Sequence, residues 1–465
     1  MSWLRAVLMV SFARKRGALH LAGLLFFFAG ALPAVAEGKV EPFFGVAGHF
    51  LHTDNFYPNS DGLWHVDLTL PVVKELSAGL VHEGLYALND PRGALVVGAK
   101  PELAGRVAQN RAIVDSYLRK YDASGLTVML TVFGNSPVVP GSAALNEQFS
   151  DWVADLLSRH PSVKYVQLHN EPNLRGFWKG TPEDYVTVYR EYGRKIKAKR
   201  PDIQLLGGAI SSLWFGPGVK WLEAAAKAGL LEFVDGISTH PYSAGKPPEV
   251  DPHYAGKGDR TDAVIAFDAM LRRWNGGKPM PIHFTEFGYS TGKDKIGWVL
   301  ANDNVKAEYV ARTVIQFVAA RVAGVPLKNI VYYDLKDDGT DDGAQSKYGL
   351  VSYDLRERKP AFHVYRSLAK LLADPGSLKP SPIVVSGAEG LHQRIWRRSD
   401  GSTLLFVWTT GEPQRRKLLF SQSPGRLVQR FSVALPGGQP VAPGGRLQEL
   451  DVDATSAPSW FVFSP

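Results

Sequence analysis

Short apolar runs alternate with longer segments of helical period along most of this chain, beginning near residue 43. A strand buried on both faces reads as a continuous apolar run, whereas a helix packed on one side repeats its apolar residues roughly every third or fourth position. Eight runs are of the strand type: residues 43–48, 80–88, 126–133, 164–169, 204–209, 233–239, 281–285 and 329–334. Eight strands separated by helices predict a parallel sheet closed into a (β/α)8 barrel.

Several connecting segments carry helix signals. Residues 149–158 and 360–372 each place their large apolar side chains on one helical face. Thr181 stands where an N-cap would, because Pro182 and two acidic residues follow it. These segments are expected to pack outside the barrel, with residues 360–372 as its last helix.

The pattern of apolar and polar residues changes beyond residue 374. Short alternating stretches follow, separated by turns such as Ser-Asp-Gly and Pro-Gly-Gly. The stretches are residues 393–396, 404–408, 430–434 and 460–463. We therefore expect a catalytic barrel over residues 37–374 and a small antiparallel β-sandwich domain over residues 375–465.

The first 36 residues differ from the rest of the chain. A basic stretch ending at Arg16 is followed by an apolar run over 18–32 and by Ala34-Val35-Ala36. This order is typical of a secretory signal peptide, with cleavage expected before Glu37. The expected location is periplasmic or secreted. The alternative is an uncleaved segment that associates with the inner membrane and leaves the protein facing the periplasm.

Composition and charge exclude several classes of protein. The 465 residues include no cysteine, which excludes disulfides, thiolate nucleophiles and cysteine-ligated metal sites. The net charge of +8 falls to +4 once the four cations of residues 1–36 are removed, too little to indicate a nucleic-acid partner. The acidic loop 334–343 does not reproduce a calcium-loop spacing and is expected to be solvated. We predict neither a metal nor a cofactor.

Two glutamates occupy the places where a barrel of this kind does chemistry. Glu171 ends the fourth predicted strand and Glu286 ends the seventh. Active sites lie at the carboxyl ends of barrel strands, and strands four and seven face each other across the mouth. Two carboxyl groups in one cleft suit glycosidic-bond cleavage, because one donates a proton to the leaving oxygen while the other acts at the anomeric carbon.

The sequence around these acids resembles glycoside hydrolase family 39, a family of clan A. The resemblance is carried by Asn170-Glu171-Pro172 within residues 168–178, Thr285-Glu286-Phe287-Gly288, His240-Pro241-Tyr242 and Tyr348-Gly349-Leu350. It implies a retaining mechanism with Glu171 as acid/base and Glu286 as nucleophile. It also implies that Asn170 holds the neighbouring sugar hydroxyl, that Tyr242 hydrogen-bonds the nucleophile and keeps it ionised, and that His240 lines the adjoining subsite.

Other candidates for sugar binding come from loops near the predicted strand ends. Trp178 is the first choice for an aromatic ring that stacks on a sugar, because it follows Glu171 on the loop that must cross the cleft. Further aromatic candidates are Trp214, Phe287, Tyr289 and Trp298, and further polar ones are His49, His52 and Asn135.

One region departs from the family pattern. Relatives carry an arginine near the end of strand two, whereas this chain has Leu80-Val81-His82-Glu83-Gly84 there. Glu83 is either a further cleft carboxylate or a salt-bridged one.

The function that follows is a retaining, endo-acting glycoside hydrolase that cleaves a bacterial exopolysaccharide. Its expected partners are the polysaccharide and the exopolysaccharide biosynthesis machinery. An alternative is a non-catalytic glycan-binding protein that assists polysaccharide export or matrix assembly. A third hypothesis is an adhesive matrix protein that binds polymer through residues 376–465.

Overall fold

The structure is a computed structural model that describes residues 41–50, 62–87, 93–211, 216–243, 245–250, 258–294, 298–442 and 444–465. The predicted signal peptide, His52 and Trp214 lie outside the described residues. The part of the chain from Glu41 to Pro465 forms one compact unit.

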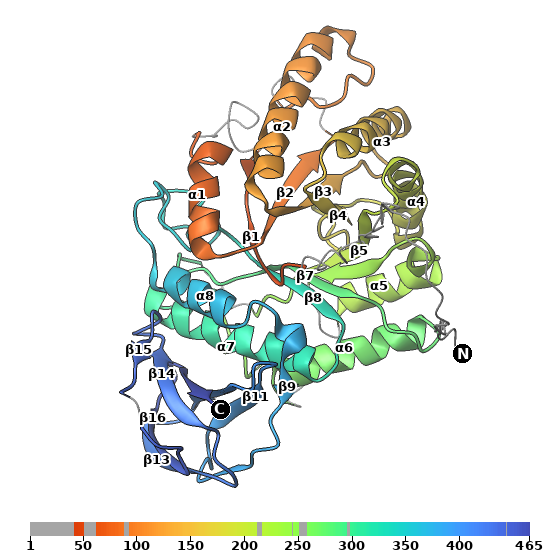
Figure 1. The fold of residues 1–465 in the computed structure, drawn as a ribbon. Helices are drawn as coiled ribbons and strands as arrows, with labels where there is room; N and C mark the ends of the chain where they lie inside the picture. The colour runs from red at the N-terminus through yellow and green to blue at the C-terminus, as the bar shows by residue number, and fades with distance from the viewer. Residues whose placement is uncertain are drawn as a thin grey trace, which may run out of the picture. The chain divides into compact units, whose positions relative to one another are not determined.

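Eight parallel strands close into a barrel at the centre of the molecule (Figure 1). Each strand pairs with the next along the chain, and the eighth pairs with the first, with Val46 opposite Tyr332. The strands are β1 (Phe44–Ala47), β2 (Leu80–Tyr86), β3 (Thr127–Phe133), β4 (Val163–Leu168), β5 (Gln204–Ile210), β6 (Gly236–Thr239), β7 (Ile282–Phe287) and β8 (Leu327–Tyr332). The predicted (β/α)8 barrel is confirmed, and every predicted strand overlaps an observed one.

The helices pack around the outside of this barrel (Figure 1). They are α1 (Val66–Leu76), α2 (Ala104–Ser124), α3 (Ser142–Arg159), α4 (Pro182–Lys199), α5 (Pro217–Lys227), α6 (Arg260–Trp274), α7 (Asp303–Val322) and α8 (Pro360–Leu371). Short 3₁₀ turns cover Pro101–Leu103, Leu230–Glu232, Gln345–Lys347 and Pro375–Ser377. Among the residues that the structure describes, none of these helices combines the length and apolarity needed to span a bilayer.

Local sequence signals explain where α4 begins. The side chain of Thr181 accepts a hydrogen bond from the backbone N–H of Asp184, and the Asp184 carboxylate accepts one from the backbone of Thr181. This capping box satisfies two backbone donors that a helix start leaves open. Pro182 adds a backbone angle already suited to the first turn.

Alternation along the strands separates two apolar layers. Leu80 packs with Met129, Tyr165 and Leu206 in a small cluster, whereas the next residue, Val81, belongs to the large cluster shared with the helices. Because successive strand residues point to opposite faces, the small cluster fills the barrel interior and the large one joins barrel to helices. The barrel is therefore a packed scaffold that fixes the positions of its strand ends.

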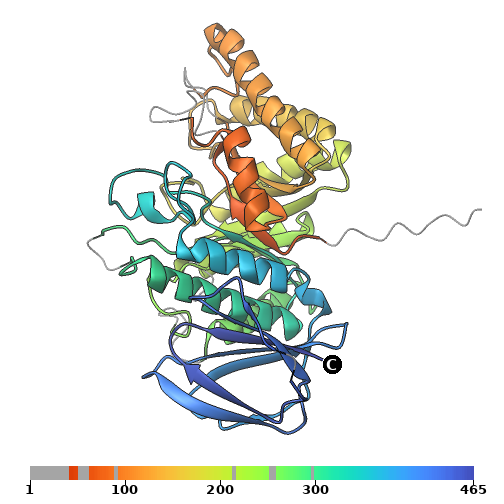
Figure 2. The same cartoon turned by 60° about the vertical axis from the view of Figure 1, so that its left-hand side comes forward.

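The C-terminal part is a pair of antiparallel sheets (Figure 2). One sheet has the order β10-β13-β16 and the other β15-β14-β17-β12-β11-β9. The strands are β9 (Lys379–Pro380), β10 (Val385–Ser386), β11 (His392–Arg397), β12 (Thr403–Trp408), β13 (Gln414–Phe420), β14 (Arg426–Ser432), β15 (Gln439–Pro440), β16 (Glu449–Ala454) and β17 (Ser459–Ser464). The expected β-sandwich thus follows α8.

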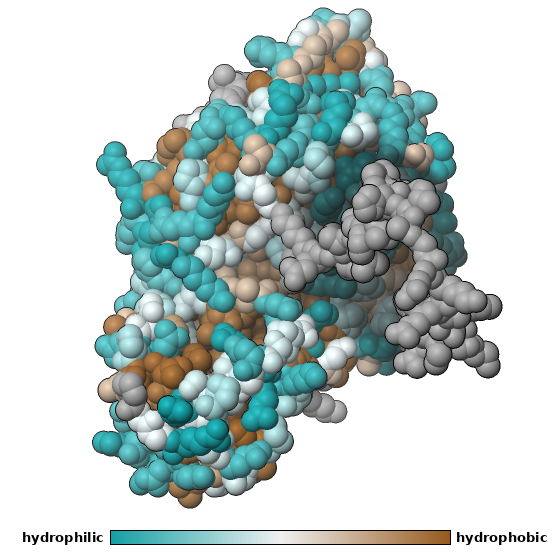
Figure 3. Space-filling model, viewed as in Figure 1, coloured by the Kyte–Doolittle hydropathy of each residue, from teal (hydrophilic) through white to brown (hydrophobic). Residues whose placement is uncertain are grey.

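The central strands of the larger sheet, β12 and β17, are buried on both faces. Leu405 faces the smaller sheet, whereas its neighbours Leu404 and Phe406 join the core cluster that includes the barrel helices. Polar contacts cross the same interface, since the Trp408 indole N–H donates to Glu249 Oε1 at 2.9 Å. Outside the interface, hydrophilic side chains cover much of the visible face, with apolar patches near the C-terminal sheets (Figure 3).

Substitution of Leu404 tests how far the C-terminal sheets and the barrel share one core. The Leu404 side chain is fully buried, so we expect Leu404→Ala to lower the free energy of unfolding by about 2–5 kcal/mol. Chemical denaturation followed by fluorescence measures this value. The matched control is Leu419→Ala, an exposed leucine of β13, which should cost less than about 0.5 kcal/mol. Equal effects in the two variants would contradict the shared core.

Candidate active site

A cavity of about 730 Å³ lies among residues at the carboxyl ends of the strands. Its lining includes both predicted catalytic acids, with Asn170, His49 and Tyr242. Aromatic and apolar walls are supplied by Tyr86, Phe133, Leu174, Phe177, Trp298, Tyr333 and Tyr348. A cavity with convergent carboxylates and aromatic walls is a candidate site for a carbohydrate.

Glu171 is held at the end of β4 by an unusual backbone. Its φ is +40°, in the left-handed region that non-glycine residues rarely adopt. The backbone N–H of Glu171 donates to the carbonyl of Ala209 at 2.9 Å, and its own carbonyl accepts from Leu174 N at 2.9 Å. These bonds fix a strained turn, which is a feature that clusters at functional sites.

Glu286 lies within β7, one residue before the strand ends. One carboxylate oxygen of Glu286, one of Glu171 and a ring nitrogen of His240 lie within 4.8 Å of one another. The side chains of Glu171 and Glu286 remain 13% and 14% exposed. The barrel thus brings together the two acids predicted from the sequence and leaves both accessible from the cavity.

His240 lies beneath the two acids and is fully buried. Its Nδ1 is 2.9 Å from Glu171 Oε1 and 3.5 Å from Glu286 Oε2. Burial alone would lower the pKa of His240, but the charge of Glu286 and the hydrogen bond to Glu171 outweigh it and raise the pKa. The expectation that His240 lines a sugar subsite is wrong, because its imidazole has no exposed surface; it positions the acids instead.

Tyr242 lies where the family resemblance implies. Its hydroxyl donates to Glu286 Oε2 at 2.8 Å, and its ring meets those of Tyr333 and Tyr348 edge to face. Burial raises the pKa of Glu286; the His240 charge and the Tyr242 hydrogen bond work against that rise, and the charge of Glu171 adds to it. Tyr242 therefore aims Glu286 and favours its charged form, although burial still outweighs it.

Strand β2 supplies a neutral imidazole in the region where the sequence departs from the family 39 pattern that it otherwise resembles. His82 Nδ1 lies 3.0 Å from the carbonyl oxygen of Thr285, and Nε2 lies 2.6 Å from the Thr131 hydroxyl. Because a carbonyl only accepts, Nδ1 carries the proton and Nε2 accepts from Thr131. Burial, with the nearby charge of His240, lowers the pKa of His82 to about 3, so the group is uncharged at neutral pH.

Glu83 resolves as a cleft carboxylate. It lines the cavity and is buried, accepting hydrogen bonds from the Tyr121 hydroxyl at 2.6 Å and from the Phe50 backbone N–H at 3.0 Å. Burial raises the pKa of Glu83 to about 7. Sequence reasoning left its role open, and the signal available was a charged residue inside an otherwise apolar strand.

Two candidates for sugar binding are placed elsewhere. Trp178 is only 2% exposed and donates its indole N–H to the carbonyl of Thr181 at 3.2 Å, so it belongs to the core and cannot stack on a sugar. The side chain of Asn135 donates to the carbonyl of Ala87, and Asn135 does not line the cavity. The expectation for Trp178 is wrong because its ring packs against Tyr185 and Tyr189 of α4. Asn135 is partly exposed, and its role in sugar binding stays a prediction.

Among the aromatic candidates for stacking, Trp298 lines the cavity as expected, whereas Phe177, Tyr86 and Phe133 line it without having been predicted. Phe177, adjacent to Trp178, is 48% exposed, and Trp298 on the loop after β7 is 56% exposed. Tyr86 and Phe133, at the ends of β2 and β3, stack with their ring centroids 4.1 Å apart. Of the other sequence candidates, Phe287 and Tyr289 are buried. Strand-end position was the available signal for Tyr86 and Phe133.

The acidic loop after β8 is less solvated than expected. Asp334 and Asp337 are buried, and Lys359 Nζ lies 2.7 and 2.8 Å from the two oxygens of Asp337. Only the distal part of the loop, with Asp341 and Asp342, matches the expectation of a solvated segment. The cause is local. Buried lysines of α7 and of the start of α8 bind the loop and hold it against the rest of the protein.

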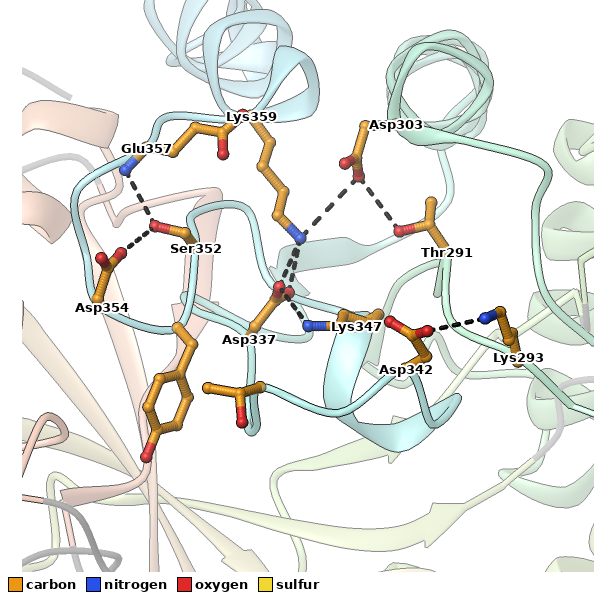
Figure 4. A pocket seen from close by; sticks show the side chains of 12 residues that line it. Thr291, Lys293, Asp303, Asp337, Asp342, Lys347, Ser352, Asp354, Glu357 and Lys359 are labelled. Carbon is orange, nitrogen blue, oxygen red and sulfur yellow. Dashed lines mark hydrogen bonds and ion pairs between the residues drawn. The ribbon is translucent and has the colours of Figure 1, made fainter.

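A second cavity, of about 550 Å³, is enclosed by this loop and the loop after β7 (Figure 4). Lys359 points between Asp303 and Asp337, and Lys293 pairs with Asp342 at 2.8 Å. These charges satisfy one another, so the arrangement is that of a structural ion-pair network.

Within the described part of the chain, two groups of residues have the donor atoms for a metal ion. Glu171, His240 and Glu286 form one, and His49, Asp334 and Asp338 form the other. In the first group the imidazole hydrogen bond to Glu171 already occupies the donor nitrogen. The arrangement there is that of two carboxyl groups held by one shared imidazole.

Comparison with solved structures gives three informative similarities. A family 39 glycoside hydrolase from Bacteroides cellulosilyticus WH2 aligns with a TM-score of 0.64 at 18% identity, covering 91% of this chain and 81% of the other. A glucosidase from Croceicoccus marinus aligns with a TM-score of 0.58 at 12% identity, covering 92% and 96%. AbfB, a family 51 α-L-arabinofuranosidase from Bifidobacterium longum, gives 0.57 at 14% identity, covering 92% and 96%.

At these identities the similarity shows a shared fold, a (β/α)8 barrel followed by a β domain. No protein-family model matches the chain. No curated protein matches it either.

The buried carboxyl of Glu83 makes stability depend on pH. Its pKa is about 7 in the folded protein against 4.5 ordinarily, so the folded state retains a proton that the unfolded chain releases. This stabilisation is complete below about pH 4.5 and is lost as the pH rises through about 7. We expect the stability difference between wild type and Glu83→Gln to shift by about 3 kcal/mol in favour of the variant from pH 5 to pH 8.

Urea unfolding of both proteins at the two pH values measures this shift. Glu102→Gln, which alters an exposed carboxyl, is the matched control and should show no such change. A difference between wild type and Glu83→Gln that is constant with pH would contradict a buried, protonated Glu83.

Proposed function

We propose that this protein is a retaining, endo-acting glycoside hydrolase with Glu286 as nucleophile and Glu171 as general acid/base. The observation that carries the proposal is the approach of their carboxylate oxygens within 4.8 Å. Retaining enzymes hold their carboxyl groups about 5–5.5 Å apart, whereas inverting ones need about 6.5–9.5 Å to admit a water molecule. The short separation favours direct attack by a carboxylate on the sugar.

The reaction proceeds in two displacements. In the first, Glu286 forms a bond to the anomeric carbon while Glu171 transfers its proton to the departing glycosidic oxygen, giving a glycosyl ester and a free alcohol. In the second, Glu171 takes a proton from water, the resulting hydroxide attacks the anomeric carbon, and the ester bond to Glu286 breaks. Both carboxyl groups return to their starting protonation states.

Neighbouring residues stabilise the two acids and bind the substrate. His240 contacts both acids from below, so its positive charge offsets their mutual repulsion. Tyr242 supplies a hydroxyl hydrogen bond to one oxygen of Glu286, which leaves the other oxygen to attack. Asn170 immediately precedes the acid/base and lines the cavity, which supports a role in binding the hydroxyl next to the anomeric carbon.

The substrate class and location rest on the family resemblance and on the N-terminal sequence. The fold similarity to a family 39 enzyme and the motifs around Glu171 support membership of that family. Within it, the sequence resembles the bacterial exopolysaccharide hydrolase PslG, which motivates an exopolysaccharide as substrate. The signal-like residues 1–36 motivate action in the periplasm or outside the cell.

Two exposed aromatic rings support cleavage at internal bonds of a polysaccharide. Phe177 follows β4 and Trp298 follows β7, and these strands lie across the barrel from each other. Both line the cavity that holds the acids. Rings on both sides of the cleavage point bind sugars of one polymer in both directions, as endo-action requires.

Removal of either acid tests the mechanism. We expect Glu171→Gln to lower kcat about 10²–10⁴-fold, because the leaving oxygen loses its proton donor. Glu286→Gln should lower kcat at least as much, because no ester forms. Reducing-end assays on a panel of bacterial exopolysaccharides measure both values.

Glu183→Gln is the matched control, since Glu183 lies in the exposed first turn of α4. A 2-fluoro-glycoside inhibitor should label Glu286 in the wild type, as detected by peptide mass spectrometry. Full activity in both acid variants, or labelling of a different residue, would refute the assignment of these two acids. Absence of both hydrolysis and labelling in the wild type would favour the glycan-binding alternative.

The exposed rings should matter for polymer and not for short substrates. We expect Phe177→Ala and Trp298→Ala each to raise KM for polysaccharide about tenfold, equivalent to about 1.4 kcal/mol of binding. KM for an aryl monosaccharide should change much less. Leu68→Ala, an exposed residue of α1, is the control. Release of monosaccharides from the first minutes of digestion would contradict endo-action.

A further inference from the structure

A second polar cluster lies at the seam where the barrel closes. Strands β1 and β8 pair there, and the backbone N–H of Leu335 extends the pairing with a 3.1 Å bond to the carbonyl of Ala47. Just beyond this pairing the chain brings together His49, Asp334 and Asp338. One donor atom from each lies within 4.8 Å of the other two.

The Asp334 carboxylate is the unusual member of this cluster. Its side chain is fully buried, and neither of its oxygens has a hydrogen-bond partner among the described residues. Oδ1 of Asp338 is also buried and unpartnered within the described part of the chain. A buried carboxylate without hydrogen bonds is strongly destabilising unless a cation compensates it.

The spacing of the donors suits a shared ion better than direct hydrogen bonds. His49 Nε2 lies 3.6 Å from Asp334 Oδ2, which is within ion-pair range but too long for a hydrogen bond. Two ligands of one tetrahedral metal ion, each about 2.0–2.1 Å from it, are about 3.3 Å apart. The observed separation is close to that edge length.

Nearby ammonium groups are engaged elsewhere. Lys306 Nζ donates to the carbonyl oxygens of Gly349 at 2.7 Å and Lys347 at 3.2 Å. Lys359 pairs with Asp337, and the Lys336 ammonium lies over the Trp64 ring at 4.5 Å. The carboxylate of Asp334 therefore takes no hydrogen bond from these lysines.

We propose that His49, Asp334 and Asp338 bind one divalent transition-metal ion of the Zn²⁺ class. An imidazole with two carboxylates matches the ligands that zinc takes in proteins, whereas calcium and magnesium prefer oxygen ligands throughout. Three protein ligands leave a coordination position for water. Because His49 also lines the large cavity, the ion lies beside the site of the acids.

The ion joins two chain segments that are far apart in sequence. His49 follows β1 and the two aspartates follow β8, so the ion clamps the barrel seam beside the cavity wall. It stabilises the folded state, because a preformed site rarely exists in an unfolded chain. This site stands independently of the glycosidase proposal, since metal binding needs no turnover.

Zinc binding to the purified full-length protein tests the proposal. After treatment with EDTA and equilibrium dialysis against Zn²⁺, elemental analysis should give one ion per chain. Asp334→Asn and Asp338→Asn should each weaken binding more than about 100-fold, because even loss of an outer-shell partner costs about 10–100-fold. Zn²⁺ should raise the Tm of the wild type and leave the Tm of both variants unchanged.

Two controls locate the ion. Asp342→Asn alters an exposed carboxylate of the same loop and should bind Zn²⁺ like the wild type. Glu286→Gln reports on the other candidate group and should also bind normally. Circular dichroism establishes that each variant is folded, and if Asp334→Asn does not fold, the partly exposed Asp338→Asn carries the test. No bound zinc, normal binding by both Asp334→Asn and Asp338→Asn, or loss of binding in Glu286→Gln would overturn the proposal.

Discussion

The close approach of two carboxylates above one imidazole is the constraint on which this molecule depends. One oxygen of each carboxylate lies within 4.8 Å of the other. Two unit charges about 5 Å apart repel by about 3 kcal/mol at an effective dielectric constant of about 20. The structure offsets this repulsion with His240 beneath both groups and with the Tyr242 hydroxyl on Glu286. A site that holds two acids together at this cost is suited to chemistry that needs both in different protonation states.

The barrel makes this approach possible because its strand ends are fixed by a packed core. Glu171 and Glu286 come from strands on opposite sides of the closed sheet, and neither strand end can shift without disturbing the apolar layers inside and outside the barrel. The left-handed backbone at Glu171 depends on the same packed core. Stability of the surrounding barrel sustains a turn that an isolated peptide would not keep.

The region around β2 gives the cavity its own electrostatic character. His82 is uncharged at neutral pH, and Glu83 adds a third glutamate to the lining. No lysine or arginine appears among the described residues that line this cavity. Control of the nucleophile therefore falls to His240 and Tyr242, whose influence is local and depends on hydrogen-bond geometry.

Sequence by itself determined the order of elements and the two acids. Strand runs, the Thr181 cap and the strand-end positions of Glu171 and Glu286 are local signals, written in hydrophobic period and residue type. Only the tertiary structure decided which side chains face the cavity. Phe177 and Trp178 are adjacent, yet one is exposed and the other buried, and His240 lies beneath the acids and not beside the sugar. The reason is that burial and charge pairing depend on loops folding against distant helices, whose contacts no local pattern of residues encodes.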